Sequence, residues 1–132
     1  MGNDHGVGAT LEAVRSLKLG EVVIIPTDTA YALAADALNE KAVAKVFSIK
    51  MREAGEALPV LVSDFNMIDK VAVASQGLKE YVQRCGSVTA VLPARGWVPL
   101  RLRGGKLAVG VRISIHPFVE RVIKAFGGPI TG

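Results

Sequence analysis

The sequence of 132 residues has little cysteine and histidine and no long apolar run. Its single cysteine, Cys85, cannot form an internal disulfide, which predicts a reducing, cytoplasmic setting. Two histidines and one cysteine, far apart in the sequence, lack the ligand spacing of a zinc site. No apolar run approaches the roughly 20 residues that a membrane span needs, and the first residues lack the pattern of a signal peptide.

The composition is typical of a globular protein. Half of the residues are hydrophobic and 21% are charged, so disorder is not expected. A chain of this length buries roughly two thirds of its unfolded surface. No internal repeat, low-complexity segment or linker is visible, and we expect residues 1–132 to form a single domain.

Charge is distributed unevenly along the chain. Residues 1–83 carry eight Lys/Arg and eleven Asp/Glu, a net charge of −3, whereas residues 84–132 carry eight basic residues and Glu120, a net charge of +7. This asymmetry predicts a polyanion or a phosphate-bearing ligand, although the basic residues can also simply keep a loop soluble. The residues predicted to contact RNA are Arg95, Arg101, Arg103 and Lys106.

Apolar periodicity predicts an α/β fold with a twisted, mixed sheet and flanking helices. The β-branched run Val22–Ile25 predicts a strand that is buried on both faces and stopped by Pro26. Further strands are predicted at residues 60–62, 89–92 and 107–113. Helices are predicted after the caps Thr10, Asn39 and Ser63-Asp64 (the last reaching about Val73), at residues 76–84, and at 117–126 with His116 as its cap.

A polar segment follows the first predicted strand directly. Thr27, Asp28 and Thr29 present two hydroxyls and a carboxylate at the end of the strand, where open sheets usually place ligands. The same residue types also form Asx and Ser/Thr turns that only shape the backbone. The residues alone leave both interpretations open.

Four segments, in order, resemble the YrdC-like family of threonylcarbamoyl-AMP synthases, which act in tRNA modification. They are the proline-threonine-aspartate-threonine segment 26–29, Lys50-Met51-Arg52 followed by 58–62, the strand segment 86–92, and the arginine-containing segment 109–118. Together they extend from the first strand to the end of the chain. The resemblance implies a mostly parallel sheet around a concave, positively charged groove.

The resemblance also implies a reaction. L-threonine, bicarbonate and ATP, with Mg²⁺, would form threonylcarbamoyl-AMP and pyrophosphate, and tRNA would be the final acceptor. By position, Lys50 and Arg52 would be catalytic and hold the threonine carboxylate and the phosphates. The amino-acid pocket would contain Thr27, Asp28, Thr29 and Tyr31, and the nucleotide side would contain Ser87, Thr89 and Arg112.

Several of these residues have a plain structural alternative. Lys50 and Arg52 can interact with the dipole at a helix C-terminus, and Thr89 can serve cross-strand packing. His116 can cap a helix or act as a general base. Arg112, set between Val109, Val111 and Ile113, is expected to face a cleft or an acidic partner, because a charged residue is rarely buried without one.

The chain also departs from the family pattern. Ala30 and Ala32 replace a valine and a glycine of the signature, and Glu53, Ala57, Ser87 and Ser114 stand where prolines are usual. The sequence ends at Gly132, before the family's ATP-binding serine-alanine-asparagine motif, so we expect a domain without that segment. An exposed sheet edge would favour a homodimer. The alternative function is a non-catalytic module that binds double-stranded RNA or tRNA.

Overall fold

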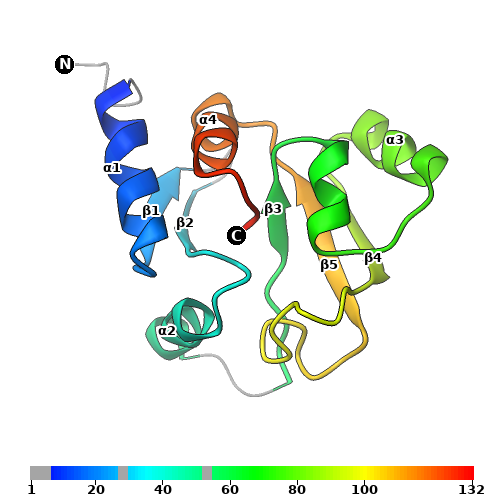
Figure 1. The fold of residues 1–132 in the computed structure, drawn as a ribbon, viewed down its shortest axis with the longest axis horizontal. Helices are drawn as coiled ribbons and strands as arrows, with labels where there is room; N and C mark the ends of the chain where they lie inside the picture. Colours follow the sequence, from blue (N-terminus) through cyan, green and yellow to red (C-terminus); the bar gives the residue numbers. More distant parts are fainter. Residues whose placement is uncertain (1–6, 27–29, 52–54) are drawn as a thin grey trace.

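The computed structural model describes residues 7–26, 30–51 and 55–132, which form an α/β fold with helices around two sheets (Figure 1). The helices are α1 (Val7–Lys18), α2 (Glu40–Lys50), the 3-10 helix η1 (Phe65–Lys70), α3 (Gln76–Cys85) and α4 (Pro117–Phe126). The strands are β1 (Val23–Pro26), β2 (Tyr31–Ala34), β3 (Val60–Val62), β4 (Thr89–Pro93), β5 (Ala108–Ile113) and β6 (Ile130–Thr131). None of the described helices combines the length and apolarity needed to cross a membrane.

The larger sheet has the strand order β4-β5-β3-β6. Its β3–β5 pairing is parallel, whereas β4–β5 and β3–β6 are antiparallel. The predicted mixed sheet is therefore confirmed, but the expectation of a largely parallel sheet is wrong for the described strands. The reason is that β4 and β5 follow one another without the crossover helix that a parallel pair requires. The predicted homodimer stays a prediction.

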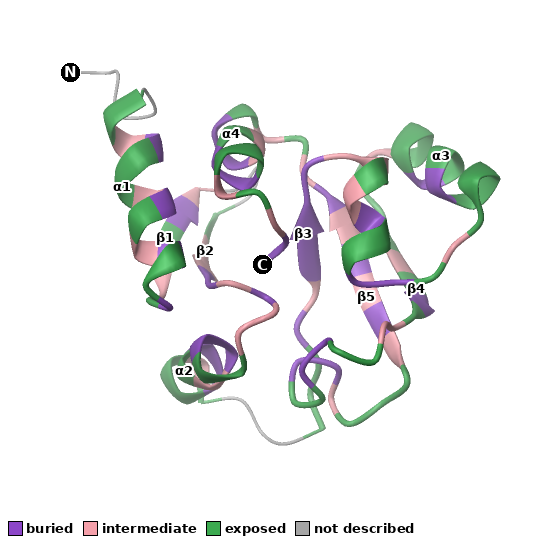
Figure 2. Cartoon of the chain, viewed as in Figure 1, coloured by how far each residue is buried: buried purple, intermediate pink, exposed green. Residues whose placement is uncertain are grey.

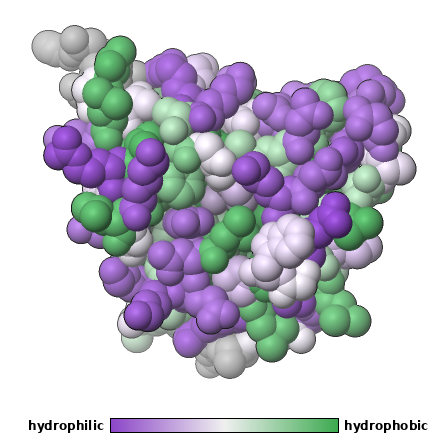
Figure 3. Space-filling model, viewed as in Figure 1, coloured by the Kyte–Doolittle hydropathy of each residue, from purple (hydrophilic) through white to green (hydrophobic). Residues whose placement is uncertain are grey.

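Strand β1 pairs with β2 in a separate antiparallel sheet of two strands. One of its faces packs against α1 and α4, and Ile25 is only 1% exposed there, but Ile24 on the other face is 69% exposed. The prediction that this strand is buried on both faces is thus wrong for the described part of the chain. Val7 and Leu11 of α1 are exposed as well, and Figure 3 shows hydrophobic atoms at the N-terminal end of this helix, with hydrophilic atoms further along it.

Strand β3 lies at the centre of the molecule and is buried along its length (Figure 2). Val60 and Val62 belong to a core with residues of α2, η1 and β5. Leu61 points the opposite way, into a second core with residues of α1, α4 and β1. Because successive side chains of a strand alternate between faces, this short strand serves both cores.

The predicted caps of α2 and α4 are confirmed. The Asn39 side chain accepts hydrogen bonds from the backbone N–H groups of Lys41 and Ala42, at 3.0 and 3.1 Å. Nδ1 of His116 accepts the N–H of Phe118 at 3.2 Å. Both side chains satisfy donors that the first turn of a helix leaves without an intrahelical partner.

Two predicted boundaries differ from the structure. Helix α1 begins at Val7, so Thr10 lies inside it, where it is buried in line with Val14 and Leu17. Its spacing of four and seven residues from them extends the core-facing stripe. Asp64 does cap the next helix, but that helix is a short 3-10 helix that ends at Lys70 and does not reach Val73.

The loop of residues 94–107 between β4 and β5 is shaped by one buried arginine. Arg103 is 9% exposed, and its Nε and Nη2 donate to the carbonyl oxygen of Val98 at 3.2 and 3.1 Å. Its Nη1 donates to the carbonyl oxygen of Lys106 at 2.7 Å. A single guanidinium thus ties together two parts of the loop that are eight residues apart.

The same loop supports the segment that follows α2. The N–H of Leu58 donates to the carbonyl oxygen of Leu102 at 2.9 Å. Gly104 lies so close to this segment that a Cβ there would be 2.7 Å from the carbonyl oxygen of Gly55. Only glycine permits such an approach, since carbon and oxygen in contact need more than 3 Å.

We expect Gly104→Ala to destabilise the protein by about 2 kcal/mol or more, because it adds a clash with Gly55 to the cost of a positive φ. Gly105→Ala is the matched control: its φ of +77° resembles the +66° of Gly104, but nothing lies within 4 Å of its added Cβ. The control should cost only about 1 kcal/mol. Urea unfolding of both variants measures the difference, and equal losses would contradict the close approach.

Thr131 joins the two sheets. Its buried hydroxyl accepts the N–H of Ala35 at 3.0 Å and donates to the carbonyl oxygen of Leu33 at 3.2 Å. Its own N–H donates to the carbonyl oxygen of Ala35 at 2.8 Å. One side chain of β6 thereby fixes the end of β2, about a hundred residues earlier in the chain.

Replacing Thr131 with valine keeps the shape of the side chain but leaves the Ala35 N–H without this buried acceptor. We expect the free energy of unfolding to fall by about 1–3 kcal/mol, the usual cost of a buried unsatisfied group. Thr131→Ser retains the hydroxyl and should lose clearly less. Denaturant midpoints that fall equally for both variants would show that packing, and not the hydrogen bonds, matters here.

Candidate functional site

The strand register places one charged residue, Arg112, in a row that is otherwise uncharged. Leu61 of β3 lies opposite Arg112 of β5 and opposite Ile130 of β6, and Arg112 lies opposite Thr89 of β4. Directly opposed residues share a face of the sheet, with Cβ atoms about 5 Å apart. The row therefore runs across all four strands on the α4 side, away from the valines that fill the main core.

Arg112 is half-buried in this row, and its Nη1 lies 3.3 Å from Oγ1 of Thr89, to which it donates. The prediction that this arginine faces a cleft is confirmed, because it lines a cavity of about 270 Å³. The cavity walls come from β2, the start of β3, the end of β5, the N-terminus of α4 and the chain end. The lining residues are Ala32, Pro59, Leu61, Arg112, Ile113, Ser114, Ile115, His116, Val119 and Gly132.

Strand β2, which follows the polar signature in the sequence, reaches this cavity. Thr27, Asp28 and Thr29 themselves lie outside the described residues, as does Arg52. In the sequence, Thr27, Asp28 and Thr29 lie between Pro26 of β1 and the strand β2. Pro26 is paired with Tyr31, which is 76% exposed. Ala32, the next residue of β2, lines the cavity. The strand that follows the predicted amino-acid pocket in the sequence therefore borders the cavity that Arg112 lines.

Lys50 occupies a different place. It is the last residue of α2 and is half-buried, and it is not among the residues that line the Arg112 cavity. Met51 ends the helix in the left-handed conformation with a φ of 55°, and its N–H donates to the carbonyl oxygens of Phe47 and Ser48. A non-glycine residue in this conformation is strained and often marks a functional segment.

Two members of the predicted nucleotide side are exposed. Ser87 lies two residues before β4, whereas Thr89 is the first residue of this strand and lies opposite Arg112. Sequence reasoning missed the apolar walls of the cavity, of which Leu61 and Val119 are part. Alternation along β3 and β5 would have placed Leu61 beside Arg112 once their pairing was known.

The four basic residues predicted to contact RNA have distinct environments. Arg101 and Lys106 are exposed, and Cζ of Arg101 lies 4.9 Å from the ring centre of Phe47. Nε of Arg95 donates to the carbonyl oxygens of Asp69 and Ala72, both at 3.2 Å. Arg103 is buried within the loop, so its assignment as an RNA contact is corrected to a structural role.

Comparison with known proteins agrees with this architecture. The sequence profile of the Sua5_yciO_yrdC family, described as telomere recombination, matches residues 15–132. A threonylcarbamoyl-AMP synthase from Vibrio vulnificus is 30% identical over 125 residues, which cover 91% of this chain and 67% of the relative. A putative threonylcarbamoyl-AMP synthase from Methanocaldococcus jannaschii is 36% identical over 105 residues, 78% of this chain and 50% of that protein.

Solved structures have the same fold. Sua5 from P. abyssi, crystallised with L-threonine, superimposes with a TM-score of 0.85 at 30% identity, over 92% of this chain and 37% of that one. E. coli YciO, at 21% identity, shares the fold with a TM-score of 0.80 over 94% of this chain and 62% of that one. This chain thus spans about two thirds of the Vibrio relative and little more than a third of P. abyssi Sua5. It belongs to the Sua5/YciO/YrdC family, together with the threonylcarbamoyl-AMP synthases.

Proposed function

We propose that this chain forms the L-threonine- and nucleotide-binding region of a threonylcarbamoyl-AMP synthase. The observation that carries the proposal is the half-buried Arg112, which lines a cavity together with Ala32 of β2, the strand that follows the signature in the sequence. The relative crystallised with L-threonine supports it, because that structure shares 30% identity and the fold with this chain. The reaction would join L-threonine, bicarbonate and ATP, and would release pyrophosphate.

Arg112 suits an anionic group at the cavity. Its planar guanidinium can donate two parallel hydrogen bonds to a phosphate or a carboxylate, and the hydroxyl of Thr89 holds one of its nitrogens. The cavity also includes Ser114 and His116 at the start of α4, where the helix dipole favours negative charge. These features would stabilise the phosphates of ATP or the charge that develops as the acyl-phosphate bond forms.

Lys50, at the end of α2, and Arg52, which follows this helix in the sequence, would hold the threonine carboxylate and the phosphates. Thr27, Asp28, Thr29 and Tyr31 would surround the amino acid. Among the described residues, no group of three His, Cys, Asp or Glu side chains could hold a metal ion. We therefore expect Mg²⁺ to bind mainly through the phosphate oxygens of ATP, the usual arrangement for this ion. The role of this chain's residues is to hold the reactants together at a suitable distance.

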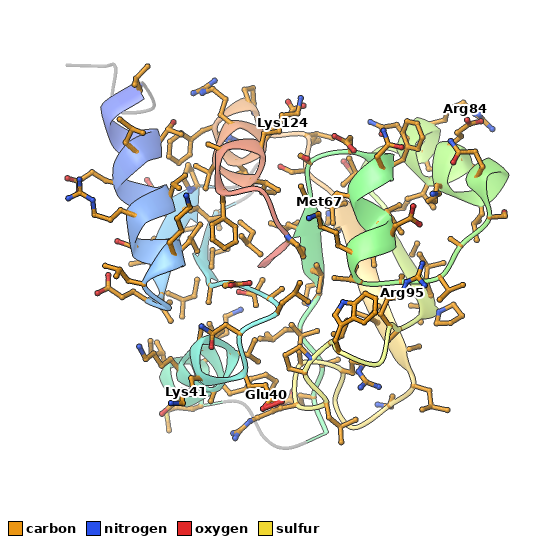
Figure 4. The ribbon with its side chains drawn as sticks, viewed as in Figure 1. Glu40, Lys41, Met67, Arg84, Arg95 and Lys124 are labelled. Carbon is orange, nitrogen blue, oxygen red and sulfur yellow. The ribbon has the colours of Figure 1, made fainter. Side chains whose placement is uncertain are left out.

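Titration calorimetry with ATP–Mg²⁺, with and without L-threonine, tests the pocket. We expect ATP binding that L-threonine strengthens, and we expect Arg112→Ala to weaken it about 10- to 150-fold, because a charge-assisted hydrogen bond contributes about 1.5–3 kcal/mol. Arg84→Ala is the matched control, since this exposed arginine lies at the far end of α3 (Figure 4). Unchanged ATP binding in Arg112→Ala would contradict the assignment. Pyrophosphate release that requires all three substrates would establish catalysis.

Binding of double-stranded RNA or tRNA is a second candidate function, favoured by the net charge of +7 on residues 84–132. Such binding would depend mainly on phosphate contacts and little on sequence. Of the basic loop residues, the exposed Arg101 and Lys106 are free of the carbonyl contacts that engage Arg95 and Arg103 in the described loop. These two would make the phosphate contacts.

The double variant Arg101→Ala/Lys106→Ala should weaken binding to a duplex of about 16 base pairs and lower the salt slope of log K by about two. Fluorescence anisotropy across a range of salt concentrations measures both quantities. Arg15→Ala/Lys18→Ala removes the same charge from the exposed face of α1 and should change the slope much less. Equal effects of the two double variants would indicate that only net charge matters.

A further inference from the structure

Trp97 presents an unusual surface in the loop of residues 94–107. It is the single tryptophan of the chain and is 61% exposed. Its polar edge is already satisfied, since Nε1 donates to the carbonyl oxygen of Lys70 in η1 at 2.8 Å. What remains for a ligand is the flat, apolar part of the indole.

The ring is held in place by its surroundings. Cζ of Arg95 lies 5.9 Å from the ring centre, and Nε of Arg95 is itself fixed by the carbonyl oxygens of Asp69 and Ala72 (Figure 4). The next residue, Val98, is 1% exposed and anchors the chain in the core. The hydrogen bond of Nε1 and the buried neighbour Val98 already restrict the indole ring. The entropy cost of ordering this side chain on ligand binding would therefore be small.

The charge around the ring is positive. Residues 94–107 contain four basic and no acidic residues. The carboxylate of Asp69 in η1 is 2.8 Å from Nζ of Lys79 and is therefore compensated. Arg103 connects the carbonyl oxygen of Val98 to that of Lys106, which brings the exposed Lys106 into the same part of the loop.

We propose that Trp97 is a stacking site for an unpaired nucleobase of a single-stranded nucleic acid, whose phosphates contact Arg101 and Lys106. Aromatic side chains next to basic residues bind single strands in this way, since every base has a flat π-face that tolerates any sequence. A duplex keeps its bases stacked inside and offers no such face. The positive charge favours a nucleic acid over an uncharged proline-rich peptide, the other common ligand of an exposed tryptophan. This site is separate from the Arg112 cavity and does not depend on synthase activity.

Fluorescence of the single tryptophan reports on this site directly. We expect an oligouridylate of about eight nucleotides, within the usual site size, to quench Trp97 emission saturably at low salt. A blunt RNA duplex and inorganic polyphosphate supply the same charge without an unpaired base, and should not quench it. Quenching by the duplex to the same extent, or no quenching by the single strand, would overturn the proposal. So would quenching by a proline-rich peptide alone.

Variants separate stacking from charge. By anisotropy with a labelled oligouridylate, Trp97→Ala should weaken binding roughly 5- to 150-fold, and Trp97→Phe less, because phenylalanine retains a smaller ring. Tyr81→Ala is the matched control: Tyr81 is 57% exposed and has Arg84 at 5.8 Å from its ring, but lies on α3. Equal losses in the two alanine variants would contradict a specific site. If Trp97→Ala does not fold, Trp97→Phe and the quenching experiment decide.

Discussion

The parallel pairing of β3 with β5 is the interaction on which the rest of the structure depends. It sets Val60 opposite Val111 and Leu61 opposite Arg112. Because side chains alternate along a strand, this register sends the valines into the main core and Arg112 to the α4 side. A slip of one residue would bury the guanidinium among apolar side chains and expose the valines. Packing of Val60 and Val111 in the main core thereby fixes the register that places Arg112 on the opposite face of the sheet.

The cavity beside Arg112 exists only when distant parts of the chain are assembled. Its walls include Ala32 of β2, Pro59 before β3 and Gly132 at the chain end. The hydrogen bonds of Thr131 hold the end of β2 against β6, and the N–H of Ala37 adds one to the carbonyl oxygen of Pro129 at 3.1 Å. Opening of the short strand β6 would break these bonds and free one wall of the cavity. Formation of the cavity is therefore coupled to the pairing of β6.

Local patterns predicted what local interactions determine. Asn39 and His116 are caps because their acceptors lie two or three residues from the N–H groups they bind. The cleft-facing position of Arg112 followed from one charged residue in an alternating apolar strand. The pairing of β1 was beyond such reasoning, since a β-branched run fits a central strand and a two-stranded sheet equally well. The exposure of Ile24 depends on whether a distant part of the chain packs on that face of the strand, and the residues around Ile24 in the sequence do not determine this.

Arg103 shows why charge counts overstate the number of contacts available to a ligand. Its guanidinium donates to the carbonyl oxygens of Val98 and Lys106, neighbours whose approach only the folded loop creates. Three of its five N–H donors are used in this way and the side chain is only 9% exposed, so little of the guanidinium remains for a phosphate, although its positive charge still adds to the surface potential. The exposed Arg101 and Lys106 are more accessible to an anion near this loop. Hydrogen bonds to the loop's carbonyl groups give Arg103 a structural role, whereas the exposed Arg101 remains accessible to a ligand. The composition of the loop alone does not distinguish the two arginines.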